Sequence, residues 1–444
     1  MSATIQLFPK LLPEGLRKRS AFTMILSILH LGGMLVDTSE NTNLRILIFN
    51  VLGKCFTIAC LIIVSVGFLV ETIKELGNFE EFAECLKYLL KQSRNVIKVG
   101  TVLVQKNKIL DLIKTVEESF YVHDKDLTVE ETTIVRKCMD NARRFSFIYL
   151  FQWFCTLVLE SSIKEEIHEM ETQNFTNENL RKMPIKLWVP FPTENTPFYQ
   201  IGVVYNVLFV ISGSWFSAVT DTLIFTFLFY MTSQFEILGC SIKNMRKDRI
   251  GEIHLKQEEN IELLTQWQRE NLNQDSDYLM TSSSGYNREM ENYLASCVVY
   301  HQQLLQNVEV LKTIMSPIEA VEVLTASILI ALSGFNLILS DDTANMVRNA
   351  TFLIYIILGL GMHCWLAGRL TTQSVQVYYD AYSSLWYIQT TSIKKSISMI
   401  IMRAQKPVVL NAGPFFSLSL ETFGKIMQTS YSYLTLLTQV NEEE

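Results

Sequence analysis

The sequence predicts an all-α membrane protein with seven transmembrane helices, a cytoplasmic N-terminus, an extracellular C-terminus and a cytoplasmic helical anchor bundle. The chain is 444 residues long, with 49% hydrophobic and 19% charged residues, whereas soluble domains carry about 25% charged residues. Several apolar runs approach the roughly 20 residues that cross a bilayer. Lysine and arginine gather on one side of these runs, as is typical of a multi-pass membrane protein. We expect its location to be the plasma membrane.

Five strongly apolar runs and two weaker ones give the seven predicted spans. The strong runs are Ile46–Val70, Phe145–Leu159, Phe198–Tyr230, Val323–Ser340 and Asn349–Gly368, and the weaker ones are Phe79–Val104 and Leu418–Val440. Weak hydropathy in a span usually means that the helix faces protein or water. We expect the same of the charged residues Lys54 and Asp221. Lys87 to Lys98 are expected to line an inner vestibule or to lie in cytoplasmic water.

The distribution of positive charge predicts the orientation. With the N-terminus inside, the four cytoplasmic pieces hold 26 lysines and arginines and the four outside pieces hold 6, as the positive-inside rule requires. Two N-glycosylation sequons begin at Asn174 and Asn349, and both lie outside in this arrangement.

The sequence predicts six parts along the chain. They are a cytoplasmic N-terminal segment (1–45), helices 1–4 (46–233), a cytoplasmic insert with anchor helices (234–315), helices 5–6 (316–368), a cytoplasmic anchor with the inner half of helix 7 (369–416), and the pore-lining part of helix 7 with the tail (417–444). Pro407 and Gly413-Pro414 interrupt the last segment, so we expect helix 7 to be two helices.

The motifs of several protein classes are missing from this sequence. The chain has no P-loop, HExxH or GxSxG motif, and its eight cysteines form no CxxC pair. We therefore expect no enzyme, no catalytic residue, no cofactor, no metal site and no nucleic-acid partner. An inside N-terminus disfavours a G-protein-coupled receptor, and a transporter is expected to have inverted repeats, of which the sequence has no sign.

The C-terminal third carries an ordered series of motifs. They are Gly368-Arg-Leu-Thr-Thr-Gln-Ser, Ala381-Tyr-Ser-Ser-Leu-Trp-Tyr, Ile401-Met-Arg-Ala-Gln-Lys-Pro, Leu410-Asn-Ala-Gly, Ser417-Leu-Ser-Leu-Glu-Thr-Phe and Thr429-Ser-Tyr-Ser-Tyr-Leu-Thr-Leu-Leu. Trp188-Val-Pro-Phe-Pro and Tyr300-His-Gln-Gln-Leu-Leu stand earlier in the chain. This series resembles the insect odorant receptor family over nearly the whole chain, most strongly from about Asn292 onward.

The resemblance implies a subunit of an odorant-gated, non-selective cation channel. Its partners would be a small volatile odorant, permeating cations, the lipid bilayer and an olfactory co-receptor subunit in a heterotetramer, on the dendrite of an olfactory neuron. The C-terminal pattern favours the odorant-binding subunit. The alternative is a gustatory-type channel that opens without the co-receptor, since Tyr433 to Gln439 comes near the gustatory Tyr-x-x-x-Leu-x-Gln pattern.

Leu436, Gln439 and Val440 are the candidate gate residues in the last span. Tyr433, Leu436 and Val440 lie near one stripe at helical spacing, and a ring of leucines can block ions by dewetting. By resemblance, Leu436 matches the family's hydrophobic gate and Gln439 its polar constriction. The alternative is that Leu436 packs inside the subunit or faces lipid. Glu442 to Glu444 would form an acidic vestibule or simply a solvated tail.

The odorant pocket is expected to be apolar and aromatic, because a small neutral ligand gains affinity by nearly complete burial. By resemblance it lies in the outer half, among helices 2 to 6. Candidate residues are Phe82, Leu86, Tyr88, Trp153, Thr156, Leu157, Tyr205, Phe209, Ser212, Phe335 and Tyr355. Ser212, Thr156 and Tyr355 are expected to hydrogen-bond a ligand oxygen. Core packing is the alternative for each aromatic residue.

Trp386, Tyr387 and Ile388 are the candidate subunit-interface residues. Helices in lipid associate without the hydrophobic drive available in water, so a cytoplasmic helical bundle is a suitable place to hold subunits together. Buried aromatic side chains dominate interface energetics. The alternative is that these three residues pack within their own subunit.

Overall fold

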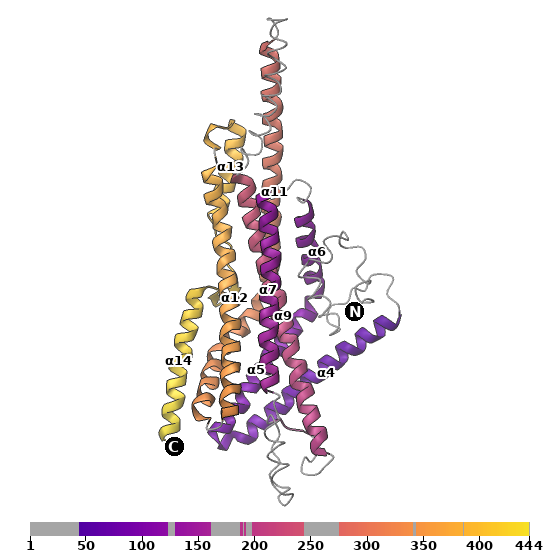
Figure 1. Cartoon of the computed structure of the whole chain (residues 1–444), viewed down its shortest axis with the longest axis vertical. Coiled ribbons are helices and arrows are strands. Elements are labelled where there is room, and N and C mark those ends of the chain that lie inside the picture. Colours follow the sequence, from indigo (N-terminus) through magenta and orange to yellow (C-terminus); the bar gives the residue numbers. More distant parts are fainter. Residues whose placement is uncertain are drawn as a thin grey trace, which may run out of the picture.

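The computed structural model is a bundle of long helices (Figure 1) and describes residues 44–122, 129–160, 187–189, 191, 198–243, 275–340, 343–384 and 386–443. The main helices are α4 (Leu44–Lys74), α5 (Phe79–Val104), α6 (Lys106–Val122), α7 (Val129–Glu160), α9 (Phe198–Lys243), α11 (Asp275–Leu339), α12 (Thr343–Ser383), α13 (Thr391–Ala404) and α14 (Leu420–Glu443). Short 3₁₀ turns, η1 (Glu75–Gly77) and η3 (Trp386–Ile388), join neighbouring helices.

Each of the seven predicted spans coincides with one of these helices, except that Ser340 follows the end of α11 and Leu418 and Ser419 precede the start of α14. The bounds of α5 are those that the sequence predicts, and several other helices continue beyond the apolar run. Four stretches of the described helices are long and apolar enough to cross a membrane, namely Val51–Gly77, Trp215–Lys243, Met290–Leu339 and Asn345–Ser383. The remaining predicted spans are α5, α7 and α14, in which polar residues interrupt the apolar ones.

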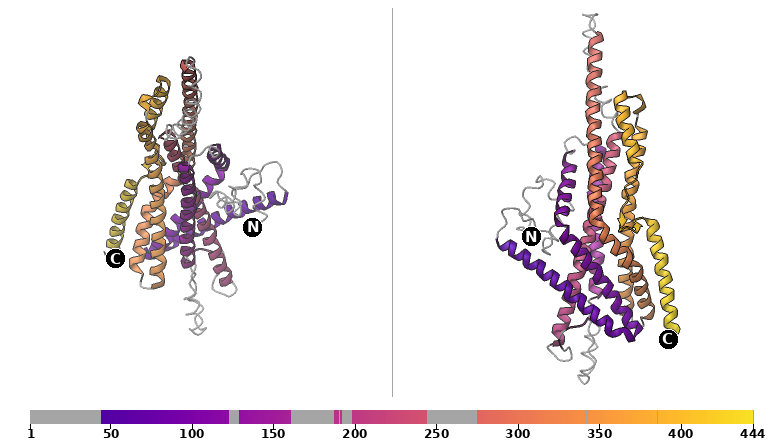
Figure 2. Two further views of the ribbon diagram at one scale, coloured as in Figure 1. Left: turned by 45° about the horizontal axis from the view of Figure 1, so that its top comes forward. Right: turned by 180° about the vertical axis from the view of Figure 1, so that it is seen from behind.

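The helix ends alternate between the two ends of the bundle, as repeated membrane crossings require. The turn between α4 and α5, the start of α12 and the end of α14 lie together at one end, and α13 with the start of α11 lies at the other (Figures 1 and 2). The three segments at the first end are those that positive charge predicts to be outside.

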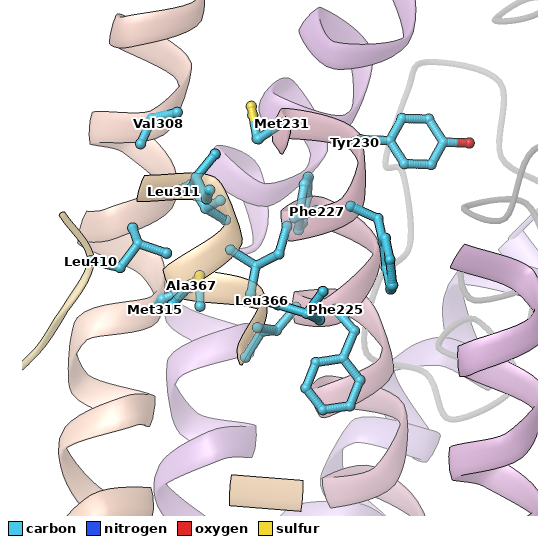
Figure 3. Packing of buried hydrophobic residues seen from close by; sticks show 14 of the residues in the cluster. Phe225, Phe227, Tyr230, Met231, Val308, Leu311, Met315, Leu366, Ala367 and Leu410 are labelled. Carbon is cyan, nitrogen blue, oxygen red and sulfur yellow. The ribbon is translucent and has the colours of Figure 1, made fainter. Parts of the chain in front are cut away.

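Helix α9 is the centre of the core. From Phe216 to Gln234 its residues are buried on every side, as expected of a helix that is apolar all round. Phe225 and Phe227 of α9 belong to one core cluster with Leu311 of α11 and Leu366 of α12 (Figure 3). The contacts of α9 with α7 and α12 are the most extensive between described helices.

Helix 7 consists of two helices, as Pro407 and Gly413-Pro414 predict. Helix α13 ends at Ala404, and a small hairpin of β1 (Asn411–Ala412) and β2 (Phe416–Ser417) leads into α14. At the hairpin turn, Gly413 has a φ of 60°, a conformation that favours glycine. Its backbone N–H donates to the Ser316 carbonyl of α11 over 3.1 Å.

The region 369–405 differs from the prediction in one respect. The sequence indicates an amphipathic segment over Ala381–Gln405, whereas α12 continues to Ser383 and α13 begins only at Thr391. The break holds η3, and the amphipathic pattern continues in α13, which buries Ile393, Ile397 and Ile400. Helix α13 packs on α11 and α12.

We predict that Ile397→Ala will lower the stability of this part of the molecule by about 2–5 kcal/mol, because the side chain is fully buried and its loss leaves a cavity. The measurement is the thermal unfolding of the purified full chain in detergent. Met399→Ala is the control, since Met399 is 58% exposed on the same helix and a surface change costs within about 0.5 kcal/mol. Equal losses in the two variants would contradict the packing of α13.

Candidate functional site

Among the described residues, helix α14 is covered by its own chain on one side only. Ile426 and Ser430 are buried, and Leu434 and Leu437 pack on a cluster around Phe335 of α11. The helix contacts α11 and α12 and stands at the edge of the bundle in all three views (Figures 1 and 2).

The predicted gate residues lie on the exposed surface of α14, beside this covered side. Tyr433, Leu436 and Val440 are 44%, 56% and 39% exposed, respectively. Gln439 is exposed beside them. The structure thus brings the predicted gate residues together on one uncovered stripe.

The predicted pocket residues lie in three separate clusters. Tyr88 and Tyr205 pack with Phe68 and Leu187. Leu86 and Phe335 pack beneath α14, whereas Trp153 and Tyr355 belong to the main core. Phe82 is partly buried, and the side chains of Leu157, Phe209 and Ser212 lie outside the described part of the chain. That these residues line one pocket stays a prediction.

Trp153 is the predicted pocket residue with an unused hydrogen-bond donor. Its side chain is 7% exposed and packs edge-on against Trp215, with ring centroids 5.2 Å apart. Among the described residues the indole Nε1 has no acceptor. A buried donor without an acceptor costs about 1–3 kcal/mol, so a ligand oxygen at this position would relieve that cost.

The other predicted donors already have partners. The Thr156 hydroxyl donates to the Gln152 carbonyl of its own helix over 3.0 Å. The Tyr355 hydroxyl lies 3.2 Å from that of Tyr149, and Tyr149 donates to Asp221 Oδ2 over 2.9 Å. Tyr355 therefore lies at the margin of a larger polar cluster.

That cluster is a buried charge network between α5, α9, α11 and α12. Lys98 Nζ lies 2.6 Å from Asp221 Oδ1 and 2.8 Å from Glu322 Oε2. Arg94 Nη1 lies 2.8 Å from Glu322 Oε1. These side chains are at most 4% exposed. Charges so buried require partners of opposite sign, since isolated ones are very costly.

His363 of α12 completes the charge network. Its Nδ1 lies 2.7 Å from Glu319 Oε1, and its Nε2 lies 3.6 Å from Asp221 Oδ1. Both the imidazole and the Glu319 carboxylate are fully buried.

The network corrects one expectation and adds residues that sequence reasoning missed. The expected vestibule or cytoplasmic water around Lys87 to Lys98 is wrong, because Arg94 and Lys98 are buried in protein and paired with acids. Glu319 and Glu322 went unnoticed because they directly precede the apolar run that begins at Val323. The sequence does indicate His363, because it is a titratable residue within a span that is otherwise uncharged.

The predicted surface sites are placed as follows. Asn349 is 4% exposed. Its amide accepts from Lys87 over 2.9 Å and donates to Ser340 Oγ over 3.2 Å, so the predicted glycan does not fit at this position in the folded chain. Trp386 is partly buried and Tyr387 is 58% exposed. Asn174 and the side chain of Ile388 lie outside the described part of the chain.

Three comparisons relate this arrangement to known proteins. A family model described as 7tm Odorant receptor matches residues 78–431. Odorant receptor Or2 of Anopheles gambiae is 30% identical over 147 residues, which are 33% of this chain and 39% of the relative. Odorant receptor 94a of Drosophila melanogaster is 21% identical over 266 residues, 59% of either chain. The chain thus aligns with 39% to 59% of the length of these two relatives.

A solved structure has the same fold. The insect olfactory receptor OR5 from Machilis hrabei, in complex with eugenol, superposes with a TM-score of 0.75 at 14% identity, over 98% of this chain and 99% of that one. At this identity the likeness concerns the fold alone. The family model covers residues 78–431, which is most of the chain. On this evidence the chain belongs to the insect odorant receptor family.

Proposed function

We propose that the chain is the odorant-binding subunit of an odorant-gated, non-selective cation channel in the plasma membrane. The observation that carries this proposal is the uncovered stripe of α14. In a channel made of several subunits, a helix that its own chain covers on one side only is suited to face the shared axis.

The chemistry of the stripe supports a watery rather than a lipid environment. Ser432, Thr435 and Gln439 are exposed on α14 together with the apolar gate residues, and a polar side chain such as Gln439 is costly to expose to lipid. Leu436 at a narrow point would close the pore by dewetting. Gln439 amides next to it would solvate cations without strong selection among them.

The ligand is a small, mostly apolar molecule with an oxygen acceptor. Trp153 Nε1 supplies a buried donor without a partner among the described residues, and the Trp153–Trp215 pair supplies aromatic surface. Eugenol is the molecule bound by the Machilis hrabei receptor of the same fold. A small organic ligand of comparable size is therefore our proposal for this chain.

The remaining parts of the proposal concern orientation and assembly. The end of the bundle that holds α13 and the start of α11 faces the cytoplasm, in line with the positive charge of the segments there. Around it, Tyr387 is exposed and free to contact a neighbouring subunit. The neighbour is an olfactory co-receptor subunit in a tetramer.

We predict that a panel of volatile compounds will evoke cation current only when this chain is expressed together with an olfactory co-receptor. The measurement is whole-cell current with the chain alone, the co-receptor alone and both together, with surface delivery checked in each case. Current from this chain alone would favour the gustatory-type alternative. An N-terminal tag that is accessible on intact cells would contradict the orientation.

We predict that Leu436→Ala will raise the current in the absence of odorant severalfold, because a smaller side chain lets water into the constriction. The measurement is leak current normalised to the amount of protein at the surface. Leu358→Ala is the matched control, since Leu358 is similarly exposed, at 50%, on α12. If the leak current of Leu436→Ala equals that of the parent, Leu436 is not the gate.

We predict that Trp153→Phe will weaken the response to an oxygen-bearing odorant about three- to ten-fold, the effect of one lost hydrogen bond. The measurement is the concentration that gives half-maximal current. Trp215→Phe is the control, because it changes the aromatic ring that packs edge-on against Trp153 and leaves the Trp153 N–H donor in place. The assignment is wrong if both variants shift the response equally.

A further inference from the structure

The charge network contains one more acid than permanent cations. Its carboxylates are Asp221, Glu319 and Glu322, and its permanent cations are Arg94 and Lys98. With a neutral His363 these described side chains would carry a net negative charge. An uncompensated charge at this depth is strongly destabilising, so one additional proton is needed for neutrality.

The geometry at His363 indicates where that proton is held. Both ring nitrogens face a carboxylate, Nδ1 at 2.7 Å from Glu319 and Nε2 at 3.6 Å from Asp221. In a neutral imidazole one nitrogen carries no hydrogen, and its lone pair would then point at an ionised oxygen. Either both nitrogens are protonated or the proton is on Glu319, and in both cases the His363–Glu319 pair holds one proton more than neutral histidine with ionised glutamate.

We infer that His363 and Glu319 share a single proton that keeps the buried network neutral, and that the neutral network positions Tyr355, which the sequence predicts to line the odorant pocket. The second part rests on the proposed function, and the first part does not. Asp221 of α9 faces the pair directly, and Glu322 of α11 and Cys364 of α12 interact with it electrostatically. Around Asp221 and Glu322 lie Arg94 and Lys98 of α5, Tyr149 of α7 and, through Tyr149, Tyr355 of α12.

The link to Tyr355 is a chain of two hydroxyl groups. Tyr149 donates to Asp221 and lies within hydrogen-bonding distance of Tyr355. The two tyrosine rings also stack, with centroids 5.5 Å apart. The orientation of Tyr355 therefore depends on where Asp221 is held by Lys98 and His363.

Glu319 also lies close to the connection between α13 and α14. Ser316 of the same α11 turn accepts the Gly413 N–H, and a Cβ on Gly413 would be 3.2 Å from Ala320. The proton-holding pair is thus near the start of the proposed pore helix on one side, and near Asp221, which Tyr149 joins to Tyr355, on the other.

The charge balance is tested with three full-length variants in detergent, by thermal stability between pH 5 and 7.5. His363→Gln leaves the proton to Glu319 alone. In the unfolded chain a glutamate releases its proton at about pH 4.3 and a histidine at about pH 6.5. A folded state that must keep the proton on a glutamate at pH 7 is therefore disfavoured about 500-fold in the folding equilibrium. Glu319→Gln and the double variant need no extra proton.

If the network must stay neutral, the folded His363→Gln protein keeps one proton that its unfolded chain releases. The folding equilibrium constant of this variant should therefore fall about ten-fold for each pH unit from pH 5 upward. The parent should hold its stability up to about pH 6.5, and the double variant His363→Gln/Glu319→Gln should lose this pH dependence. His301→Gln controls for removal of a buried histidine, since His301 packs beside the ring of Phe235.

Two results would overturn the charge-balance inference. One is a His363→Gln protein whose stability does not change with pH. The other is a double variant whose loss of stability at pH 7.5 is as large as the losses of the two single variants added together. Neither measurement uses an odorant, so the failure of the proposed function would not be confused with the failure of this inference.

The positioning role is tested by Tyr149→Phe, which removes the hydroxyl that joins Asp221 and Tyr355 and keeps the ring. We expect the amount of protein at the cell surface to be unchanged. We expect the odorant concentration that gives half-maximal current to rise about three- to ten-fold. A proportional loss of surface protein and maximal current with an unchanged half-maximal concentration would indicate a structural role only, and would overturn the positioning role.

Discussion

The burial of six titratable side chains in one place is the constraint on which the arrangement of this bundle depends. A charge surrounded by apolar helices is tolerated only where its partner lies within a few ångströms. The six come from four helices and meet within hydrogen-bond or ion-pair distance; they are Arg94, Lys98, Asp221, Glu319, Glu322 and His363. Sliding or rotating any of these helices by one residue would separate a charge from its partner, so the network sets their register.

Apolar packing could not set the register with the same precision. Helix α9 is buried all round, and in lipid the outer surfaces of the helices are apolar as well, so many rotations bury similar areas. The polar contacts distinguish one arrangement from the rest. Helix α14 contributes no side chain to the network and rests on α11 and α12 through a few residues such as Leu434. A helix held in this way can shift without separating a buried ion pair.

Local features of the fold could be predicted from the sequence, and long-range partners could not. The start of α5 follows from Asn78, whose side chain accepts from the Glu81 N–H over 3.4 Å, and its course follows from the apolar period. Pro407 and Gly413 mark the break in helix 7 for equally local reasons. Asp221 was expected to face protein or water, and it lies in protein. Its partner Lys98 is 123 residues away in the sequence, and hydropathy carries no information about which charge meets which.

The same distinction applies to the site. The gate stripe depends on spacing within a single helix, and therefore α14 presents Tyr433, Leu436 and Val440 together. The pocket residues come from five helices, and their grouping depends on helix rotations that residue type does not reveal. Glu319 and Glu322 were missed because a hydropathy window ends where charged residues begin, although α11 continues through that boundary without a break.

The length of α11 has a mechanical consequence. The helix has 65 residues, roughly 98 Å at about 1.5 Å per residue, and Pro317 lies within it, where the missing backbone donor weakens one turn. The arm from Asp275 to Pro317 is roughly 63 Å long. A tilt of one degree at the proline turn would move the far end of this arm by about 1 Å. A displacement near Glu319 that is too small to disturb the local packing would therefore be large enough to alter side-chain contacts at the opposite end of the molecule.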